Sequence, residues 1–324
     1  MGDKSKIEWT EATWNPITGC TPVSEGCVNC YAKREAEGRL RGKFGYPADE
    51  PFRVTFHGED RLNDPLRWKR PRKIFVCSMG DLFHEDVPVE WIDKVIDVIA
   101  RCEQHRFMLL TKRPERMRDY FLGLRDDPEQ AMRFRSGRTE LHKYALALRR
   151  GEPLRNVWLG VTVENQQRAD ERIPVLLQIP AAKRFVSVEP MLGPVYFVDV
   201  PVGVLGPLRP MRKGLPEDIP RLDWVICGGE TGPEARPMHR EWVRSLRDQC
   251  VAAQVPFFFK SWGEWKFICE VIIPEYDKAD YPEYWRRPGE KPMFAFPDGT
   301  TLERLGRRQT GRELDGRTWD EEPS

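Results

Sequence analysis

Short apolar runs alternate with helical patterns along most of the chain. Six runs of four to eight residues are rich in Val, Ile, Phe and Leu, a composition typical of buried strands. These runs are residues 73–78, 106–110, 156–163, 184–188, 223–227 and 256–259. Between them, apolar residues recur at a spacing of about 3.6, which predicts helices. The predicted helices are residues 88–102, 115–124, 167–178 and 239–253.

Strands that alternate with helices favour a parallel sheet, because parallel neighbours need a crossover connection. We therefore predict an α/β fold, a partial or full parallel (β/α) barrel of six to seven strands, over residues 1–268. Residues 125–150 are charged and predict an insertion, helical or loop, into this barrel. Residues 269–324 are rich in Pro, Gly, Arg and Trp and predict an irregular or hairpin extension packed on the barrel.

The overall charge is nearly balanced. The 324 residues include 52 Lys and Arg against 51 Asp and Glu, for a net charge of +1. This balance argues neither for nor against a nucleic-acid partner, so only local clusters of charge could. The chain has no apolar run of about 18 residues and no hydrophobic leader at its charged N-terminus. We therefore expect no membrane span and a cytoplasmic location.

Each predicted strand is followed by polar residues. The carboxyl ends of parallel strands share one face, where α/β proteins bind their ligands. A functional cavity is therefore expected where these residues meet. They are Ser78, Asp81, Thr111, Lys112, Thr162, Glu164, Ser187, Glu189, Glu230 and Lys260. Gly228 and Gly229 also follow a strand, and two glycines would let a ligand approach the backbone closely.

Three cysteines, Cys20, Cys27 and Cys30, lie in one loop with the spacing C-x6-C-x2-C. Cys-x-x-Cys lets two thiolates reach one metal ion or cluster. Structural zinc takes four ligands, whereas an iron–sulfur cluster with three thiolates keeps one iron open to another ligand. A 4Fe-4S cluster is therefore favoured. A zinc site with a distant fourth ligand, a disulfide with a spare thiol and a redox Cys-x-x-Cys remain as alternatives.

Four of the remaining cysteines fall within the pattern of strands and helices. Cys77 and Cys227 lie in predicted strands, and Cys102 and Cys250 on predicted helices. We expect these four to be small buried hydrophobic residues.

Two stretches combine basic and aromatic or glycine residues. Residues 67–72 are basic around Trp68, and residues 304–312 end in a basic, glycine-containing run. Such stretches could contact phosphate groups. A solvated charged face is the other interpretation, and the pattern favours it for residues 67–72.

The cysteine loop resembles the cluster loop of radical S-adenosylmethionine (SAM) proteins, closest to the spore photoproduct lyase-like branch. The resemblance rests on the segments Asn15–Cys20 and Gly26–Ala32, although the commonest spacing in that superfamily, C-x3-C-x2-C, is three residues shorter. Over nearly its whole length, the chain resembles an uncharacterised family of three-Cys-motif proteins from phages and bacteria. The matching stretches are residues 78–86, 110–117, 160–165, 187–190, 227–230 and 236–238.

The resemblance implies a radical SAM-like barrel in which Cys20, Cys27 and Cys30 hold a 4Fe-4S cluster. It implies that SAM binds the fourth iron and yields a 5′-deoxyadenosyl radical. The implied cofactor-binding residues are Ser78, Asp81, Thr111, Lys112, Glu164, Glu189, Gly228, Gly229 and Glu230. The relatives and the basic stretches point to a nucleic-acid base or nucleotide as substrate.

Two other functions remain open from the sequence. One is a zinc- or cluster-stabilised, non-catalytic module that binds a partner protein in phage–host conflict. The other is a barrel enzyme of non-radical chemistry that uses Glu164, Glu189 and Glu230 as acids and bases.

Overall fold

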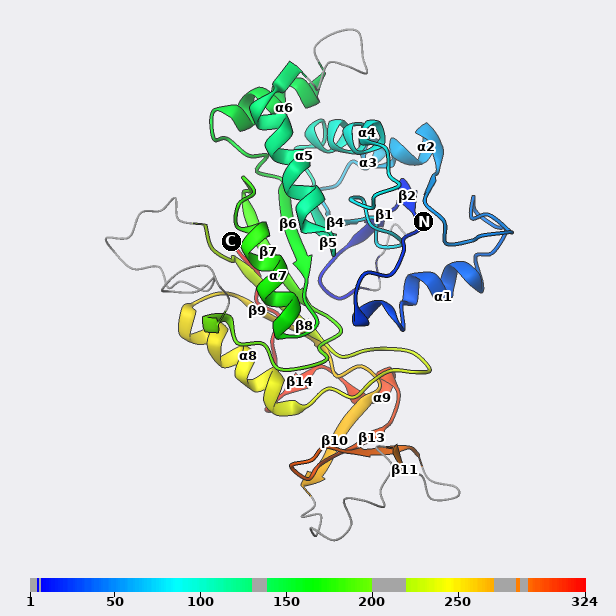
Figure 1. The fold of residues 1–324 in the computed structure, drawn as a ribbon, viewed down its shortest axis with the longest axis vertical. Helices are drawn as coiled ribbons and strands as arrows, with labels where there is room; N and C mark the ends of the chain where they lie inside the picture. Colours follow the sequence, from blue (N-terminus) through cyan, green and yellow to red (C-terminus); the bar gives the residue numbers. More distant parts are fainter. Residues whose placement is uncertain (1–4, 6, 130–138, 200–219, 271–283, 286–290) are drawn as a thin grey trace.

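The computed structural model describes residues 5, 7–129, 139–199, 220–270, 284–285 and 291–324 (Figure 1). Its central element is a seven-stranded sheet in the order β1-β4-β5-β6-β7-β8-β9, with every neighbouring pair parallel. The strands are β1 (Ala12–Trp14), β4 (Lys73–Val76), β5 (Arg106–Thr111), β6 (Val157–Thr162), β7 (Lys183–Val188), β8 (Trp224–Gly228) and β9 (Phe257–Ser261).

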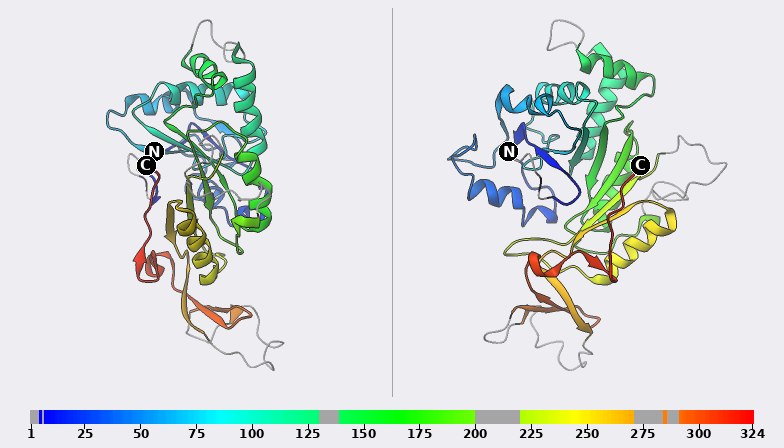
Figure 2. Two further views of the ribbon diagram at one scale, coloured as in Figure 1. Left: turned by 90° about the vertical axis from the view of Figure 1, so that its left-hand side faces the viewer. Right: turned by 180° about the vertical axis from the view of Figure 1, so that it is seen from behind.

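The sheet curls into an open half-barrel with helices packed on its outer side (Figures 1 and 2). The longer helices are α1 (Tyr31–Glu37), α4 (Val89–Ala100), α5 (Pro114–Asp126), α6 (Glu140–Arg149), α7 (Gln166–Leu176) and α8 (Arg240–Ala253). This arrangement confirms the α/β prediction and its parallel sheet. Six of the seven strands were predicted from their apolar runs. β1 was not, since its three residues are too few to show a period.

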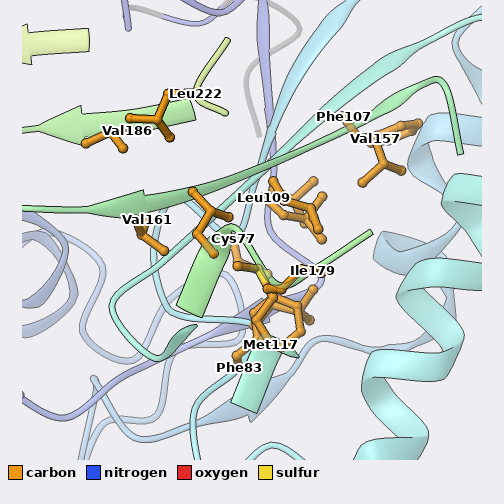
Figure 3. Close-up of a cluster of buried hydrophobic side chains, with 14 of the residues drawn as sticks. Cys77, Phe83, Phe107, Leu109, Met117, Val157, Val161, Ile179, Val186 and Leu222 are labelled. Carbon is orange, nitrogen blue, oxygen red and sulfur yellow. The ribbon is translucent and has the colours of Figure 1, made fainter. Parts of the chain in front are cut away.

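Alternating residues of each strand face two separate apolar clusters. On β6, Val157 and Leu159 pack in the large outer cluster against the helices, and Trp158 packs in a smaller cluster on the concave side. Figure 3 shows part of the outer cluster. The concave cluster is closed by Trp9, whose ring centroid lies 4.9 Å from that of Phe75. Aromatic side chains therefore fill the amino-terminal half of the half-barrel, and polar residues remain at the other end.

The predicted insertion contains helix α6, which belongs to the core. Thr139 caps this helix by accepting a hydrogen bond from the backbone N–H of His142. Its apolar side chains Leu141, Tyr144 and Leu148 are buried in the outer cluster with α4 and α5. The charged residues of α6 itself, Lys143 and Arg149 among them, lie on its exposed face. Residues 125 and 126 of the predicted insertion belong to the end of α5, and residues 130–138 lie outside the described residues.

The C-terminal region forms a second sheet of four strands in the order β10-β13-β12-β11. The strands are β10 (Trp265–Glu270), β11 (Tyr284–Trp285), β12 (Met293–Ala295) and β13 (Thr300–Arg304). The predicted domain boundary between residues 268 and 269 falls within β10. Residues 271–283 and 286–290 of the predicted extension lie outside the described residues.

The chain then returns to the half-barrel through residues 317–322, which we call the C-terminal strap. The backbone N–H of Phe259 on β9 donates to the carbonyl of Trp319, 2.9 Å away. The indole N–H of Trp224 donates to the carbonyl of Glu321 at 2.7 Å, and Lys73 pairs with Glu322 at 2.5 Å. The strap thus joins the amino ends of β4, β8 and β9.

The remaining elements are short. They are β2 (Ile17–Thr18) paired with β3 (Thr55–Phe56), β14 (Glu313–Leu314) paired with β15 (Arg317–Thr318), and the helices α2 (Gly58–Leu62), α3 (Asp64–Arg67) and α9 (Arg307–Thr310). Within the described part of the chain, no helix is long and apolar enough to cross a membrane.

Candidate functional site

A cavity of about 380 Å³ lies at the carboxyl ends of the sheet strands. The three loop cysteines, Cys20, Cys27 and Cys30, all line it. Apolar side chains that include Trp9 and Phe75 line it from the concave cluster. The strand ends and the cysteine loop therefore meet at one site.

Seven of the nine predicted cofactor-binding residues line this cavity. They are Ser78, Asp81, Thr111, Lys112, Glu189, Gly229 and Glu230. Glu164 and Gly228 are not among its lining residues. Among the predicted acidic residues, however, Asp81, Glu164 and Glu230 have carboxylates that are hydrogen-bonded to other side chains of the protein.

Glu164 anchors the cysteine loop to the end of β6. Its carboxylate is fully buried and accepts hydrogen bonds from the Ser24 hydroxyl at 2.6 Å, Lys112 Nζ at 2.5 Å and Arg172 Nη1 at 2.9 Å. Gly26 packs against the same carboxylate, because a Cβ atom at Gly26 would lie 2.4 Å from Glu164 Oε1. The structure therefore places Glu164 behind the loop, where its contacts hold the loop in place.

Glu230 anchors the Cys-x-x-Cys segment to the end of β8. It accepts hydrogen bonds from Asn29 Nδ2 at 3.0 Å and from Arg236 Nε at 2.8 Å. Burial opposes ionisation of Glu230, but the hydrogen bonds with Arg236 and Asn29 outweigh it and lower the pKa of the carboxyl. Asn29 lies between Cys27 and Cys30, so this contact fixes the backbone that carries both thiols.

Asp81 and Arg113 anchor the first cysteine to the ends of β4 and β5. Asp81 accepts a 2.7 Å hydrogen bond from the Thr111 hydroxyl and pairs with Arg113 at 3.4 Å. Arg113 Nη1 donates to Cys20 Sγ at 3.3 Å, and its Nε donates to Glu85 at 2.5 Å. Arg113 is not among the site residues predicted from the sequence, although it stands in the polar segment after β5. Its position after a strand could have identified it, as it identified Thr111 and Lys112.

Ser78 contacts the start of α1 through its backbone. Its carbonyl accepts a hydrogen bond from the Tyr31 hydroxyl, and its own hydroxyl donates to Asn15 Oδ1 at 3.2 Å. Tyr31 directly follows the last cysteine of the motif. The turn after β4 is therefore bonded to both flanks of the cysteine loop.

The two strand-end glycines serve the packing of the chain on itself. A Cβ atom at Gly229 would lie 2.3 Å from the carbonyl oxygen of Trp262, so only glycine fits there. The backbone N–H of Gly229 also donates to the carbonyl of Ser261 at 2.9 Å. The predicted close backbone approach is present at Gly229, but the neighbour is the segment after β9. At Gly228 a Cβ atom would make an ordinary contact with Lys260, 3.4 Å away.

Glu189 and Lys260 form an ion pair in the cavity wall, with both side chains mostly buried. No further partner of either side chain is found within the described residues. The hydroxyl-bearing residues Thr162 and Ser187 line the cavity beside them, 5% and 2% exposed. These four residues, unlike Asp81, Glu164 and Glu230, leave hydrogen-bonding capacity for a ligand.

Seven of the eight cysteines, all except Cys269, divide into two groups. Cys20, Cys27 and Cys30 are partly exposed, whereas Cys77, Cys102, Cys227 and Cys250 are buried, as predicted for small hydrophobic residues. Cys77 also lines the cavity, and its buried side chain packs in the outer cluster with Phe83 and Met117 (Figure 3). The described core cysteines thus offer no fourth ligand beside the loop.

The loop thiols differ in their electrostatic surroundings. Burial, reinforced by the charge of Asp81, raises the pKa of Cys20 to about 12. Burial also opposes ionisation of Cys27, but nearby Lys112 and hydrogen bonds from the backbone of Val23 and from Ser24 together lower the pKa of that thiol. Among the described residues, no three Cys, His, Asp or Glu side chains are gathered closely enough to hold a single metal ion as they stand.

The two basic stretches have mainly structural contacts. Residues 67–72 precede β4, at the end of the sheet away from the cavity, where Arg67 pairs with Asp60 and Asp64. In the second stretch, Arg307 lines the cavity and pairs with Glu8. A ligand in the cavity could therefore meet the second stretch but not the first.

Comparisons with known proteins give one result for the whole chain. Neither the curated proteins nor the solved structures contain a match. A family model described as a protein of unknown function, DUF5131, matches residues 4–323. The chain therefore belongs to the DUF5131 family.

Proposed function

We propose that the cavity holds a 4Fe-4S cluster on Cys20, Cys27 and Cys30 together with SAM, and that the protein is a radical SAM-type enzyme. One observation carries the proposal. All three loop thiols line one cavity at the carboxyl ends of a curled parallel sheet, while Cys77, Cys102, Cys227 and Cys250 are buried in the core. This is the position where parallel α/β folds bind their ligands.

The donor set fits such a cluster. Three thiolates can hold three irons and leave the fourth iron open to another ligand, and a bound cluster would supply the electron that cleaves SAM. A single structural zinc ion would need four ligands, and the loop supplies three thiols. The loop backbone that carries the three cysteines is held at strand ends by Glu164, Glu230 and Arg113.

The residues of the protein would hold and orient the ligand. The loop is fixed by Glu164, Glu230 and Arg113, so the thiols keep their places relative to the sheet. Glu189 and Lys260 offer an acceptor and a donor from the cavity wall. Apolar side chains of the concave cluster, Trp9 and Phe75 among them, line one side of this space, and an apolar wall strengthens polar contacts made beside it.

We further propose a nucleic-acid base or nucleotide as substrate, as the sequence analysis predicted. Aromatic side chains in the cavity lining, Trp9, Tyr31, Phe52 and Phe75, provide surfaces on which a base can stack. The cations Arg34 and Arg307 also line the cavity and could meet a phosphate group. A reducing compartment such as the cytoplasm would suit exposed thiols and a cluster.

The test is anaerobic purification followed by iron, sulfide and zinc analysis of the same sample. About four irons and four sulfides per chain are expected. The reduced protein should then release 5′-deoxyadenosine from SAM, and Cys30→Ala should abolish this release. Zinc without sulfide would overturn the proposal and favour the zinc-stabilised binding module. A cluster that yields no 5′-deoxyadenosine would reject the radical SAM reaction but keep the metal site.

A further inference from the structure

We infer that Arg113 is a positioning residue for Cys20 and raises the reduction potential of the cluster that Cys20 helps to hold. The inference rests on the proposed cluster. Its starting observation is the hydrogen bond from Arg113 Nη1 to Cys20 Sγ, with a length of 3.3 Å. Arg113 belongs to the polar segment after β5, and the proposed function uses it only to fix the loop.

The guanidinium of Arg113 is fixed on all sides. Its side chain is 9% exposed. Besides Cys20, it donates to Glu85 at 2.5 Å, to the carbonyl and hydroxyl oxygens of Thr21 at 3.2 and 3.0 Å, and to Asp81 at 3.4 Å. A planar group with five N–H donors is well suited to such a network. The network leaves the guanidinium little freedom to move away from the sulfur.

The backbone also directs Arg113 toward the cysteine loop. β5 ends at Thr111, and α5 begins at Pro114 with Arg113 as its N-cap residue. The backbone N–H of Arg113 donates to the Thr111 hydroxyl at 2.9 Å, and that hydroxyl donates to Asp81. These contacts fix the turn between strand and helix independently of the hydrogen bond to Cys20.

The three loop thiols are not equivalent in this respect. Cys27 Sγ lies 3.7 Å from the Ser24 hydroxyl, a neutral group. Within the described residues, no side chain bonds to Cys30 Sγ. Among the described residues, Cys20 is the one loop thiol that accepts a hydrogen bond from a charged side chain. Lys112 lies near Cys27 and acts on it through its charge alone. Hydrogen bonds to sulfur ligands and nearby positive charge stabilise the electron-rich, reduced form of a cluster. Arg113 should therefore make the cluster easier to reduce.

The experiment compares variants of the full chain after anaerobic reconstitution. Arg113→Met removes the cation and its donors, and Arg113→Lys restores the charge without the planar group. Arg118→Met is the matched control, because Arg118 lies on the helix that Arg113 caps and, among the described residues, pairs with exposed Asp119 alone. Iron and sulfide are counted in each variant, and the potential is measured by a redox titration followed by electron paramagnetic resonance.

Arg113→Met should keep its iron and lower the equilibrium constant for one-electron reduction at least tenfold, a shift of about 59 mV. Arg113→Lys should recover most of this loss, and Arg118→Met should match the wild type. A wild-type potential in Arg113→Met, or an equal shift in Arg118→Met, would overturn the inference. If Arg113→Met does not assemble a cluster, Arg113→Gln, which keeps an N–H donor without charge, must show the lowered potential instead. Wild-type protein without iron and sulfide would overturn the proposed function itself, a separate result.

Discussion

The Ser24 hydroxyl donates a 2.6 Å hydrogen bond to Oε1 of Glu164, across 140 positions of the sequence. This contact joins the cysteine loop to the end of β6. Asn29 and Glu230 form a similar contact at the end of β8. The strand-end acids, which face ligands in many α/β proteins, here hold in place the loop that carries the thiols.

Glu164→Ala should destabilise the metal-free protein by about 3–5 kcal/mol, because it leaves Lys112 and Arg172 without their buried counter-charge. Urea unfolding measures the effect. Glu189→Ala is the control. It removes a carboxylate that lines the cavity and has one described partner, Lys260, so it should lower the free energy of unfolding by less than Glu164→Ala does. Equal stability of Glu164→Ala and wild type would show that this anchor contributes nothing.

Gly229→Ala and Gly228→Ala form a matched pair of neighbouring substitutions. At Gly229 the new methyl group would meet a backbone oxygen at 2.3 Å, and the backbone has to shift. We expect a loss of roughly 1–3 kcal/mol or more, typical of overpacking. At Gly228 the nearest atom is 3.4 Å away, and stability should hardly change. Thermal unfolding of both variants distinguishes them, and a tolerated Gly229→Ala would contradict the packing described.

The two groups of cysteines should respond in opposite ways to replacement by alanine. Cys30→Ala should lose most of the iron while the unfolding free energy of the metal-free protein changes by less than about 0.5 kcal/mol. Cys227→Ala should keep the iron but lose about 1 kcal/mol, because its buried thiol packs 3.7 Å from Met191 Sδ. Iron analysis and urea unfolding of both variants test this. Iron retained by Cys30→Ala would remove that thiol from the proposed site.

Asp93 should make the stability depend on pH in acid solution. Burial raises the pKa of Asp93 from 3.8 to about 6, and the hydrogen bond from Tyr120 only partly offsets it. The folded pKa lies above the unfolded one, so the folded protein binds the proton more tightly. Stability from this group is therefore present at low pH and is lost as pH rises through about 6.

Asp93→Asn should accordingly stabilise the protein near neutral pH by roughly 1–2 kcal/mol and have little effect at about pH 4. Urea midpoints at several pH values measure the difference. Asp119→Asn, which changes an exposed carboxylate on α5, is the control and should follow the wild-type curve. A constant offset at every pH would exclude titration of Asp93 as the cause.

The sequence was most informative where structure depends on local pattern. The apolar runs of β4 to β9 identify buried strands, and polar residues after each run correctly indicate a shared cavity. The roles of Glu164 and Glu230 as anchors of the cysteine loop could not be predicted from a local pattern. Their donors, Ser24 and Asn29, come from about 140 and 200 positions away, and only the folded chain brings them together.

The role of Arg113 could not be predicted from the sequence either. The sequence places it after β5 with Thr111 and Lys112, and no local pattern distinguishes a cation that faces a thiol from one that faces solvent. The distinction comes from Glu85 and Thr21, which surround its guanidinium in the folded protein. Helix α6 was likewise hidden by its exposed charged face, because burial of its apolar side depends on the neighbouring helices.

The C-terminal strap has a consequence for the folding kinetics of the protein. Its ion pair joins Lys73 to Glu322, 249 positions away, so its formation carries a large loop-closure entropy. Contacts of such long range form late in folding. Until the strap docks, the outer edge of β9 has no partner, and unpaired strand edges pair readily with other chains. The yield of refolding should therefore fall with protein concentration, and weakening the strap should steepen that fall.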